Sequence, residues 1–450
     1  MDDAAPPLLE LEDIQSGVLR PRPSPYAATY ILLRIDDRRD GRALLRRLGD
    51  AVTSAAAGGA DRDAWVSVSL TFEGLKALGA PKASLDSFPW EFRQGMTARA
   101  RALGDVGESA PEQWERPFGT SDIHVVLTGV APDEARLDAA IARARQAIAA
   151  LPGVTPIWRQ DCRAPPDGKE PFGFKDGISH PAIEGSGVPG DNPYERPLKA
   201  GELVLGYRDE TGGFPPAPEP AALGRNGTYV AFRKLHQKVA EFRRYLRVNA
   251  ADPDDEELLA AKMMGRWRSG APLALRPLHD DPALGADGAR NNAFLFRADD
   301  ALGYKTPPGS HVRRCNPRDA DVAGVVRLHR MIRRGTAYGP LLPEGVLEDD
   351  GADRGLMFAF VGAHLRRQFE FVQSEWINGG AFLGLGETKD PVAGASDGDG
   401  AYAIPRRPIP RRVRGLASFV VTRGGEYGFM PSLSALRWLA DLPDDDGRAA

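Results

Sequence analysis

Residues 27–35 read AATYILLRI, and this stretch decides which fold the chain can adopt. An almost unbroken apolar run of this length is typical of a buried strand. The following residues, 40–57, carry leucines at helical spacing, which predicts an amphipathic helix. Residues 64–71 alternate between apolar and polar side chains, as a strand does when one face is buried. The chain therefore begins with strand, helix and strand.

The same order recurs further along the N-terminal third. A short helix is expected at 71–79, a strand at 123–130, an Ala-rich helix at 132–151 and a closing strand at 154–159. Two successive strand–helix–strand units are the ferredoxin-like arrangement, an antiparallel sheet with helices on one face. We therefore expect an α+β protein with an N-terminal ferredoxin-like domain over residues 1–165.

Residues 166–450 repeat this order of strands and helices with longer loops, and we expect them to form a second domain. The expected elements are strands at 203–207, 227–235 and 355–362, helices at 236–249, 254–268 and 364–376, a hairpin over 416–432 that turns at Arg423 and Gly424, and a closing helix. Residues 195–226 and 385–413 are rich in Gly and Pro and read as long loops. Long loops in a compact domain usually line a site.

Composition excludes several classes of protein. With 450 residues, 42% of them hydrophobic and 27% charged, the chain has the composition of a soluble globular protein. A net charge of -4 without a sustained basic stripe argues against a nucleic-acid partner. Two cysteines, Cys162 and Cys315, cannot supply a disulfide framework or a zinc or iron–sulfur site. The acidic N-terminus and the absence of long apolar runs predict a cytoplasmic protein without a membrane segment.

The first candidate for chemistry is Asp176, in the stretch PFGFKDGISHP at 171–181. Glycines surround it, and glycines allow a close approach that side chains forbid. Phe172 and Phe174 precede it, and an apolar wall can shift the pKa of a carboxyl toward acid–base work. A tight turn whose Asp caps the next segment remains the alternative.

His311 is the second candidate, in PPGSHVRRCNPR at 307–318. A His beside arginines suits a cofactor that needs an axial nitrogen ligand and carries carboxylates, and haem is one such cofactor. A basic surface turn remains open for this segment. The third stretch, IRRGTAYGP at 332–340, reads as the end of a helix, with the target of the Arg333 guanidinium left open.

At these three stretches together the chain resembles the dye-decolourising peroxidase (DyP) family, and in particular its larger members. GFKDG (173–177) resembles the GxxDG motif of the family, HVRRCNPR (311–318) its proximal-histidine segment, and RRGTAYG (333–339) its distal-arginine segment, in the same order. Further similar blocks at 13–20, 261–272, 369–378 and 423–439 extend the resemblance over nearly the whole chain.

This resemblance implies two ferredoxin-like halves, with one haem b per chain in the C-terminal half. It also implies that His311 is the axial iron ligand, Asp176 the distal acid–base group and Arg333 the distal arginine. The residues implied to contact the haem are Gly177, Ile178, Ser179, Asn316, Arg318 and Arg333, with Asn316 and Arg318 near a propionate.

The implied function is a peroxidase that reduces hydrogen peroxide and oxidises dyes or phenolic compounds by one-electron steps. Tyr338 and Trp376 are candidates for surface residues that relay electrons from bulky dyes, with ordinary core packing as the alternative for both. A homo-oligomer is left open. Two other functions remain open, a haem-handling protein that binds haem for transport, storage or iron release, and a haem-free structural protein.

Two departures from the family pattern bear on the shape of the pocket. The residues before His311 are TPPGS, where many relatives carry a Cys-Pro start and an Ala, and the distal segment has Thr336 and Ala337 where apolar residues and Pro are frequent. His180 is the rival ligand, but it lies four residues from Asp176 on the same loop. That position would put the ligand and the acid on one face of the cofactor.

Overall fold

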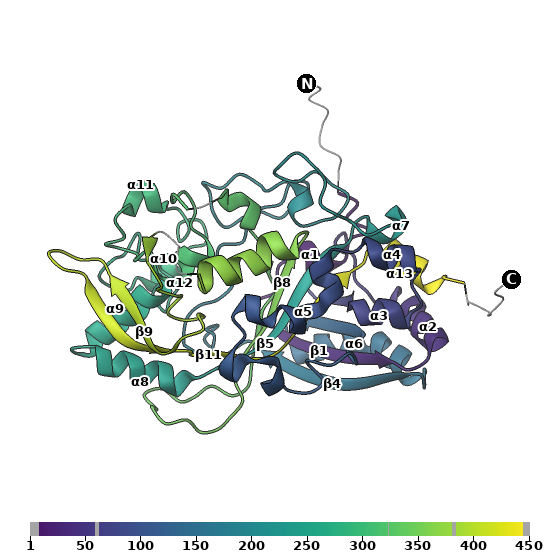
Figure 1. Cartoon of the computed structure of the whole chain (residues 1–450), viewed down its shortest axis with the longest axis horizontal. Helices are drawn as coiled ribbons and strands as arrows, with labels where there is room; N and C mark the ends of the chain where they lie inside the picture. Colours follow the sequence, from purple (N-terminus) through teal and green to yellow (C-terminus); the bar gives the residue numbers. More distant parts are fainter. Residues whose placement is uncertain (1–8, 59–62, 323, 380–383, 444–450) are drawn as a thin grey trace.

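In the computed structural model, which describes residues 9–58, 63–322, 324–379 and 384–443, one antiparallel sheet of nine strands runs through both halves of the chain (Figure 1). The strand order is β4-β1-β3-β2-β11-β5-β8-β6, and β7 pairs with β8. These strands are β1 Ala27–Ile35, β2 Trp65–Leu70, β3 Val125–Ala131, β4 Val154–Arg163, β5 Thr228–Gln237, β6 Ile332–Arg333, β7 Thr336–Tyr338, β8 Gly355–Gly362 and β11 Val420–Met430. A separate pair consists of β9 Asp397–Ile404 and β10 Arg411–Ala417.

The N-terminal half forms the sheet order β4-β1-β3-β2, which is the ferredoxin-like order. The stretch that opened the sequence analysis is β1, the second strand of this order, and Ile31 pairs with Leu127 on β3 and with Arg159 on β4. Its apolar run is buried almost throughout because neighbouring strands and helices cover it. The predicted α+β ferredoxin-like half is confirmed.

The C-terminal half repeats the same order as β11-β5-β8-β6. Its second strand is broken into β6 and β7, both of which pair with β8. The two halves meet between β2 and β11, where a single pair of residues, Leu70 and Phe429, is in register. The chain therefore consists of two ferredoxin-like halves, as the sequence predicted.

Side-chain caps fix where several helices begin. The side chains of Asp37, Asp133 and Asp252 each accept a hydrogen bond from the backbone N–H three residues later, and this bond satisfies a donor that the helix leaves unpaired. The α-helices are α1 Ser16–Leu19, α2 Arg38–Leu48, α3 Phe72–Ala77, α4 Lys82–Ser87, α5 Trp90–Leu103, α6 Glu134–Ala149, α7 Ala221–Gly224, α8 Val239–Asn249, α9 Pro253–Met264, α10 Pro282–Ala286, α11 Phe296–Asp300, α12 His311–Cys315 and α13 Leu433–Ala440. The closing helix α13 returns to the N-terminal half and packs against α2 (Figure 1).

The predicted helices are present with different ends. The helix expected at 40–57 is α2, which ends at Leu48. The residues after it pair instead with their surroundings, since the N–H of Thr53 donates to the carbonyl of Val66 at 3.0 Å. The helix expected at 364–376 is present as two π-helical segments, Leu365–Glu370 and Val372–Ile377.

Two segments differ in type from the prediction. One expected strand is a turn, and one expected loop contains strands. Residues 203–207 are not a strand, because the N–H groups of Leu203 and Val204 bond back to Ala200 in a buried local turn. Residues 385–413, expected as a loop, contain β9 and part of β10. Gly and Asp are rare in strands, so the residues of this segment do not look like a strand in the sequence. Each strand nevertheless buries an apolar or aromatic side chain, Tyr402 on β9 and Val413 on β10.

The last strand also differs from the prediction of a hairpin over 416–432. β11 passes through Arg423 and Gly424 as one strand, with an irregularity in its pairing to β5 between Thr422 and Gly424. Gly424 is needed for packing, because a Cβ atom there would overlap the ring of Phe118. The glycine that suggested a turn therefore allows a close contact within a strand.

The helix end expected around 332–335 is also wrong. Arg333 is the last residue of β6, and the chain passes through Arg334 and Gly335 before β7 begins.

Among the described residues, no helix is long and apolar enough to cross a membrane.

The side chain of Gln15 fills the junction between the two halves. It is fully buried, donates to the carbonyl groups of Val68 at 3.0 Å and Pro431 at 2.7 Å, and accepts from the N–H of Val68 at 2.8 Å. Because β2 and β11 share a single pair in register, this amide takes the place of strand-to-strand hydrogen bonds.

We predict that Gln15→Leu lowers the free energy of unfolding by roughly 2–4 kcal/mol, since it leaves three buried backbone groups without partners. Urea unfolding of the purified protein measures this difference. Gln146→Leu on the exposed face of α6 is the matched control and should change stability by less than about 0.5 kcal/mol. Equal stability of the two variants would contradict the role assigned to Gln15.

Candidate active site

A cavity of about 280 Å³ lies in the C-terminal half, against the face of the sheet formed by β8, β5 and β11. Apolar and aromatic side chains make up much of its wall, among them Phe172, Phe174, Phe294, Phe296, Leu356, Phe358, Phe369, Val372 and Ile377. The N-terminal half contributes Gly104, Asp105 and Ser109. All the site residues predicted from the sequence line this one cavity, namely Asp176, Gly177, Ile178, Ser179, His311, Asn316, Arg318 and Arg333.

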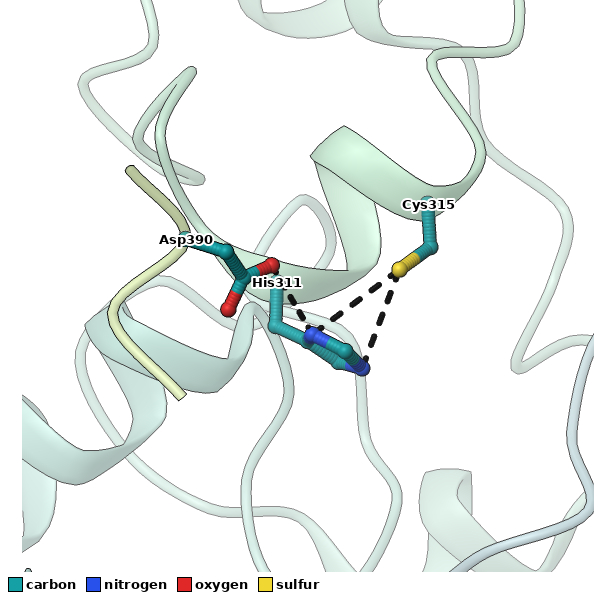
Figure 2. A group of neighbouring side chains, drawn as sticks. All are labelled: His311, Cys315 and Asp390. Carbon is teal, nitrogen blue, oxygen red and sulfur yellow. Dashed lines mark hydrogen bonds and ion pairs between the residues drawn. The ribbon is translucent and has the colours of Figure 1, made fainter. Parts of the chain in front are cut away.

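His311 is the first residue of α12, and a buried carboxylate fixes its ring (Figure 2). The Nδ1 atom lies 2.9 Å from Oδ2 of Asp390, which is fully buried. The other oxygen of Asp390 accepts from the N–H groups of Val392 at 2.8 Å and Ala393 at 2.9 Å. With a proton held at Nδ1, the lone pair of Nε2 is available to a metal.

The electrostatics of this pair favour an ionised carboxylate. Burial would raise the pKa of Asp390, but the His311 ring and the N–H of Ala393 outweigh burial and lower it. Burial likewise lowers the pKa of His311, and the neighbouring Cys315 and Asp390 outweigh it and raise that pKa well above its usual value. The pair therefore has the arrangement of a histidine ligand oriented by a carboxylate.

Cys315 lies one turn after His311, and its Sγ atom is 3.8 Å from both ring nitrogens (Figure 2). Within the described part of the chain, His311, Cys315 and Asp390 are the one group of His, Cys and carboxylate side chains close enough to share a metal ion. Since both oxygens of Asp390 already accept hydrogen bonds, we assign Asp390 to orienting the ring of His311.

The turn that carries Asp176 has a backbone that ordinary residues rarely adopt. Gly177 has φ 81° and Ser179 has φ 75°, and both values lie in the left-handed region. The turn is tied down by Arg333, whose Nη2 donates to the carbonyl of Ile178 at 2.8 Å. No hydrogen bond or ion pair within the described ranges occupies the Asp176 carboxylate, which lines the cavity. An acid is therefore held at the cavity wall with its oxygens free.

Besides Arg333, three arginines line the cavity close to this turn, namely Arg318, Arg330 and Arg266. Arg318 lies 3.7 Å above the ring of Phe294 and donates to Asn292 and Phe294. Burial, together with the nearby Arg266 and Arg330, lowers the pKa of Arg318 to about 9. Arg330 forms a two-point ion pair with Glu195 at 2.7 and 2.8 Å.

This group of guanidinium groups carries more positive charge than its neighbours neutralise. Within the part of the chain that the structure describes, Arg266 donates only to neutral partners, the carbonyls of Gly270 and Asn291 and the side chain of Asn292. Burial lowers its pKa to about 10, and Arg333 contributes to the same shift. Buried arginines without enough carboxylates are a good site for the carboxylates of a ligand.

The carboxylate of Glu170 anchors the chain that leads into the Asp176 turn. It is 9% exposed, and its carboxylate accepts from the N–H groups of Phe172 and Phe174, both at 3.0 Å, and from the side chain of Gln237 at 2.6 Å. Burial raises the pKa of Glu170 to about 7, against the effect of these hydrogen bonds. The chain between Glu170 and Asp176 thus wraps around a buried carboxyl group.

Some residues of the predicted segments lie elsewhere. Arg313 and Arg314 are buried outside the cavity wall, where they donate to backbone carbonyls such as that of Thr306. The rival ligand His180 is also outside the wall, and burial followed by nearby arginines lowers its pKa well below the usual value.

The placement of Tyr338 and Trp376 on the surface was wrong. Tyr338 is 2% exposed and Trp376 is 3% exposed. The hydroxyl of Tyr338 donates to Asp353 at 3.1 Å, and Trp376 packs against the rings of His329 and Phe371. The alternative of core packing is confirmed for both.

Sequence reasoning missed four residues of the site, Asp390, Arg266, Arg330 and Glu170. Asp390 is 79 residues from His311 in a segment read as a loop, and nothing local marks it as a partner. Arg266 lies in one of the blocks that resemble the DyP family, and Glu170 stands directly before the PFGFKDG stretch. These positions, next to or within segments already singled out, are the features of the sequence from which Arg266 and Glu170 could have been found.

Comparisons with known proteins agree with this geometry. A family model described as "DyP dimeric alpha+beta barrel domain" matches residues 13–152. "Peroxidase 2" of Mycetinis scorodonius is 34% identical over 405 residues, which cover 83% of this chain and 75% of that protein. "Dye-decolorizing peroxidase msp1" of the same organism is 31% identical over 402 residues, with the same coverage.

Solved structures extend the similarity to three dimensions. A dye-decolorizing peroxidase in complex with 2,6-dimethoxyphenol superposes with a TM-score of 0.84 and 29% identity, covering 96% of this chain and all of the other. A peroxidase from Auricularia auricula-judae gives a TM-score of 0.82 at 27% identity, with the same coverage. On these similarities in sequence and fold, the chain belongs to the dye-decolourising peroxidase family and is a haem peroxidase of that type.

Proposed function

We propose that this chain holds one haem b through His311, reduces hydrogen peroxide and oxidises phenolic compounds or dyes. The observation that carries the proposal is that His311, Asp176 and Arg333 line one cavity, with the His311 ring fixed by Asp390. Each peroxide would take up two electrons and two protons to give two waters, while two reductant molecules lose one electron each.

The residues of the cavity fit the cofactor. Haem needs an axial nitrogen, apolar walls and cations for its carboxylates. His311 would offer Nε2, and Arg318, Arg266 and Arg330 would bind the carboxylates, with Asn316 beside them. Gly177, Ile178 and Ser179 would form the wall next to the ring. When bound, haem would supply the iron that peroxide oxidises and that reductants return to its resting state.

Asp176 would move the proton that peroxide reduction requires. Its free carboxylate would accept the proton from one peroxide oxygen and return it to the other oxygen, which leaves as water. Arg333 would stabilise the negative charge that develops as the O–O bond breaks, because a guanidinium remains charged and cannot take the proton itself. The hydrogen bond from Arg333 to the carbonyl of Ile178 would hold its guanidinium group beside the turn that carries Asp176.

The haem-handling function finds less support. Binding haem requires the ligand and the arginines, but it requires neither a free acid nor Arg333 at the cavity wall. The remaining expectations stay predictions, namely a cytoplasmic location, a homo-oligomer, and a domain boundary at residue 165. That boundary would fall directly after β4, which ends at Arg163.

Mixing the haem-loaded protein with hydrogen peroxide in a stopped-flow spectrometer tests the function. We expect a rapid change of the Soret band that a phenol reverses. Asp176→Asn should keep the haem but slow this change by about 100-fold or more, the usual contribution of a general acid–base group. Asp167→Asn, an exposed residue of the same segment, should react at the normal rate. A Soret band that peroxide leaves unchanged in the unmodified protein would favour haem handling.

The ligand assignment predicts that His311→Ala loses haem, because the axial nitrogen is removed. The ratio of Soret to protein absorbance after purification with added haem measures occupancy. His279→Ala, which changes an exposed loop residue, should keep full occupancy. Full occupancy in His311→Ala would rule out this residue as the axial ligand.

The buried carboxyl of Glu170 predicts a dependence of stability on pH. Its pKa is about 7 in the fold and 4.5 ordinarily, so the folded state binds this proton more tightly than the unfolded state. The stabilisation is complete below pH 4.5 and is lost as the pH rises through 7. We expect the free energy of unfolding to fall over this interval by up to about 1.4 kcal/mol per pH unit.

Urea unfolding between pH 5 and pH 8 measures this slope. Glu170→Gln should lack the contribution, whatever its absolute stability, while Glu112→Gln on the exposed surface should keep it. The same slope in both variants would mean that another group titrates.

A further inference from the structure

The hairpin formed by β9 and β10 carries a local concentration of positive charge. Residues 406–414 read RRPIPRRVR and contain five arginines, and no acidic residue occurs between Asp399 and Glu426. The whole chain has a net charge of -4, so this cluster stands out against an acidic background. The hairpin lies at the end of the molecule opposite the C-terminus (Figure 1).

Most of this charge is exposed and has no carboxylate partner. Arg411 binds Asp255 through two contacts, at 2.6 and 2.9 Å. The other four arginines are exposed and form no ion pair with any residue that the structure describes, namely Arg406, Arg407, Arg412 and Arg414. Arg412 and Arg414 flank the buried Val413, so both lie on the outer face of β10. A surface of this kind attracts a partner with negative charge.

The tip of the hairpin presents an apolar side chain between these arginines. Ile409 is 71% exposed and stands between two exposed prolines. Beside the hairpin, Nε of Arg407 donates to the hydroxyl of Tyr304 at 3.2 Å. Tyr304 is exposed, and so is Leu302, two residues before it. A group of exposed apolar side chains bordered by charge marks a surface that binds a partner.

The form of this surface favours a lipid bilayer over a peptide or a small molecule. Small molecules bind in concave sites, and peptides commonly bind in grooves. The side chain of Ile409 is too exposed to lie in a groove of the protein. A bilayer accepts a projecting apolar side chain at the boundary below its headgroups, and anionic headgroups attract nearby arginines. The long apolar stems of arginine suit the same boundary, because they leave the charged group in water.

We propose that the β9–β10 hairpin is a docking surface for an anionic lipid bilayer. Ile409 enters the boundary between headgroups and acyl chains, and Arg406, Arg407, Arg412 and Arg414 bind the negatively charged headgroups. The contact is peripheral and reversible, since one side chain and a few charges anchor a protein weakly. It gives the enzyme a location, and neither the cavity nor its cofactor takes part in it.

Sedimentation of the haem-loaded protein with lipid vesicles tests this proposal. Vesicles that contain phosphatidylglycerol provide the anionic surface, and vesicles of phosphatidylcholine alone provide the neutral one. The fraction of protein that sediments with the vesicles gives a partition coefficient. We expect binding to the anionic vesicles that weakens as salt is added, because salt screens the attraction, and little binding to the neutral vesicles.

Two variants separate the charges from the apolar tip. Arg412→Gln combined with Arg414→Gln should lower the partition coefficient about fivefold for each arginine removed. Ile409→Ser should lower it about tenfold or more, because the inserted side chain is lost. All three residues are exposed, so both variants should fold, and haem content and thermal unfolding check this.

Matched controls remove the same kinds of group elsewhere. Arg47→Gln combined with Arg143→Gln takes two exposed arginines from α2 and α6. Val106→Ser shortens an exposed apolar side chain in the N-terminal half. Both controls should bind the anionic vesicles as the unmodified protein does.

Three results would overturn the proposal. The first is an unmodified protein that does not bind the anionic vesicles, and the second is equal binding to both kinds of vesicle. The third is an Ile409→Ser variant that binds normally while the arginine variant is weakened, because that result would assign the arginines to a soluble acidic partner. Sedimentation uses no peroxide, so a failure of the proposed peroxidase function would be seen separately, in the stopped-flow reaction.

Discussion

The hydrogen bond between His311 and Asp390 is the interaction on which the site depends. It joins residues 79 positions apart, one at the start of α12 and one in the segment before β9. Because the carboxylate is fully buried and both its oxygens accept hydrogen bonds, it holds the ring with Nδ1 toward Asp390 and leaves Nε2 to bind a ligand. Asp176, Arg333 and the cationic group of Arg266, Arg318 and Arg330 line the same cavity, although they come from segments far apart in the sequence.

Uncompensated positive charge is distributed unevenly over the cavity wall, so parts of the wall differ in the ligand groups that they favour. The arginines near the Asp176 turn are incompletely neutralised, whereas Arg233 is balanced by Asp105. The carboxylates of a ligand would therefore be favoured beside those arginines rather than beside Arg233. Apolar side chains from the sheet, among them Leu356 and Phe358, line the same cavity, and electrostatic interactions are stronger beside apolar walls than in water.

The repeated fold can be predicted from the sequence because most of its strands and helices carry clear patterns of apolar residues. β1 is the clearest case, with an almost unbroken apolar run. Prediction failed where a residue type serves packing, as Gly424 does under the Phe118 ring, or where Gly and Asp hide a strand, as in β9. The candidate site was found because its residues lie in short, distinctive segments. Asp390 could not be found, since its role exists only through a contact across the fold.

The broken strand between β6 and β7 shows how an ordered scaffold accommodates an irregular functional segment. In the N-terminal repeat the corresponding strand, β2, is continuous and lies between two other strands. In the C-terminal repeat it is the outermost strand, so the interruption at Arg334 and Gly335 breaks no ladder beyond it. The repeated unit therefore contains two versions of the same strand. The inner version, β2, keeps the regular hydrogen bonding that a strand between two neighbours needs, whereas the outer version, β6 and β7, can be irregular.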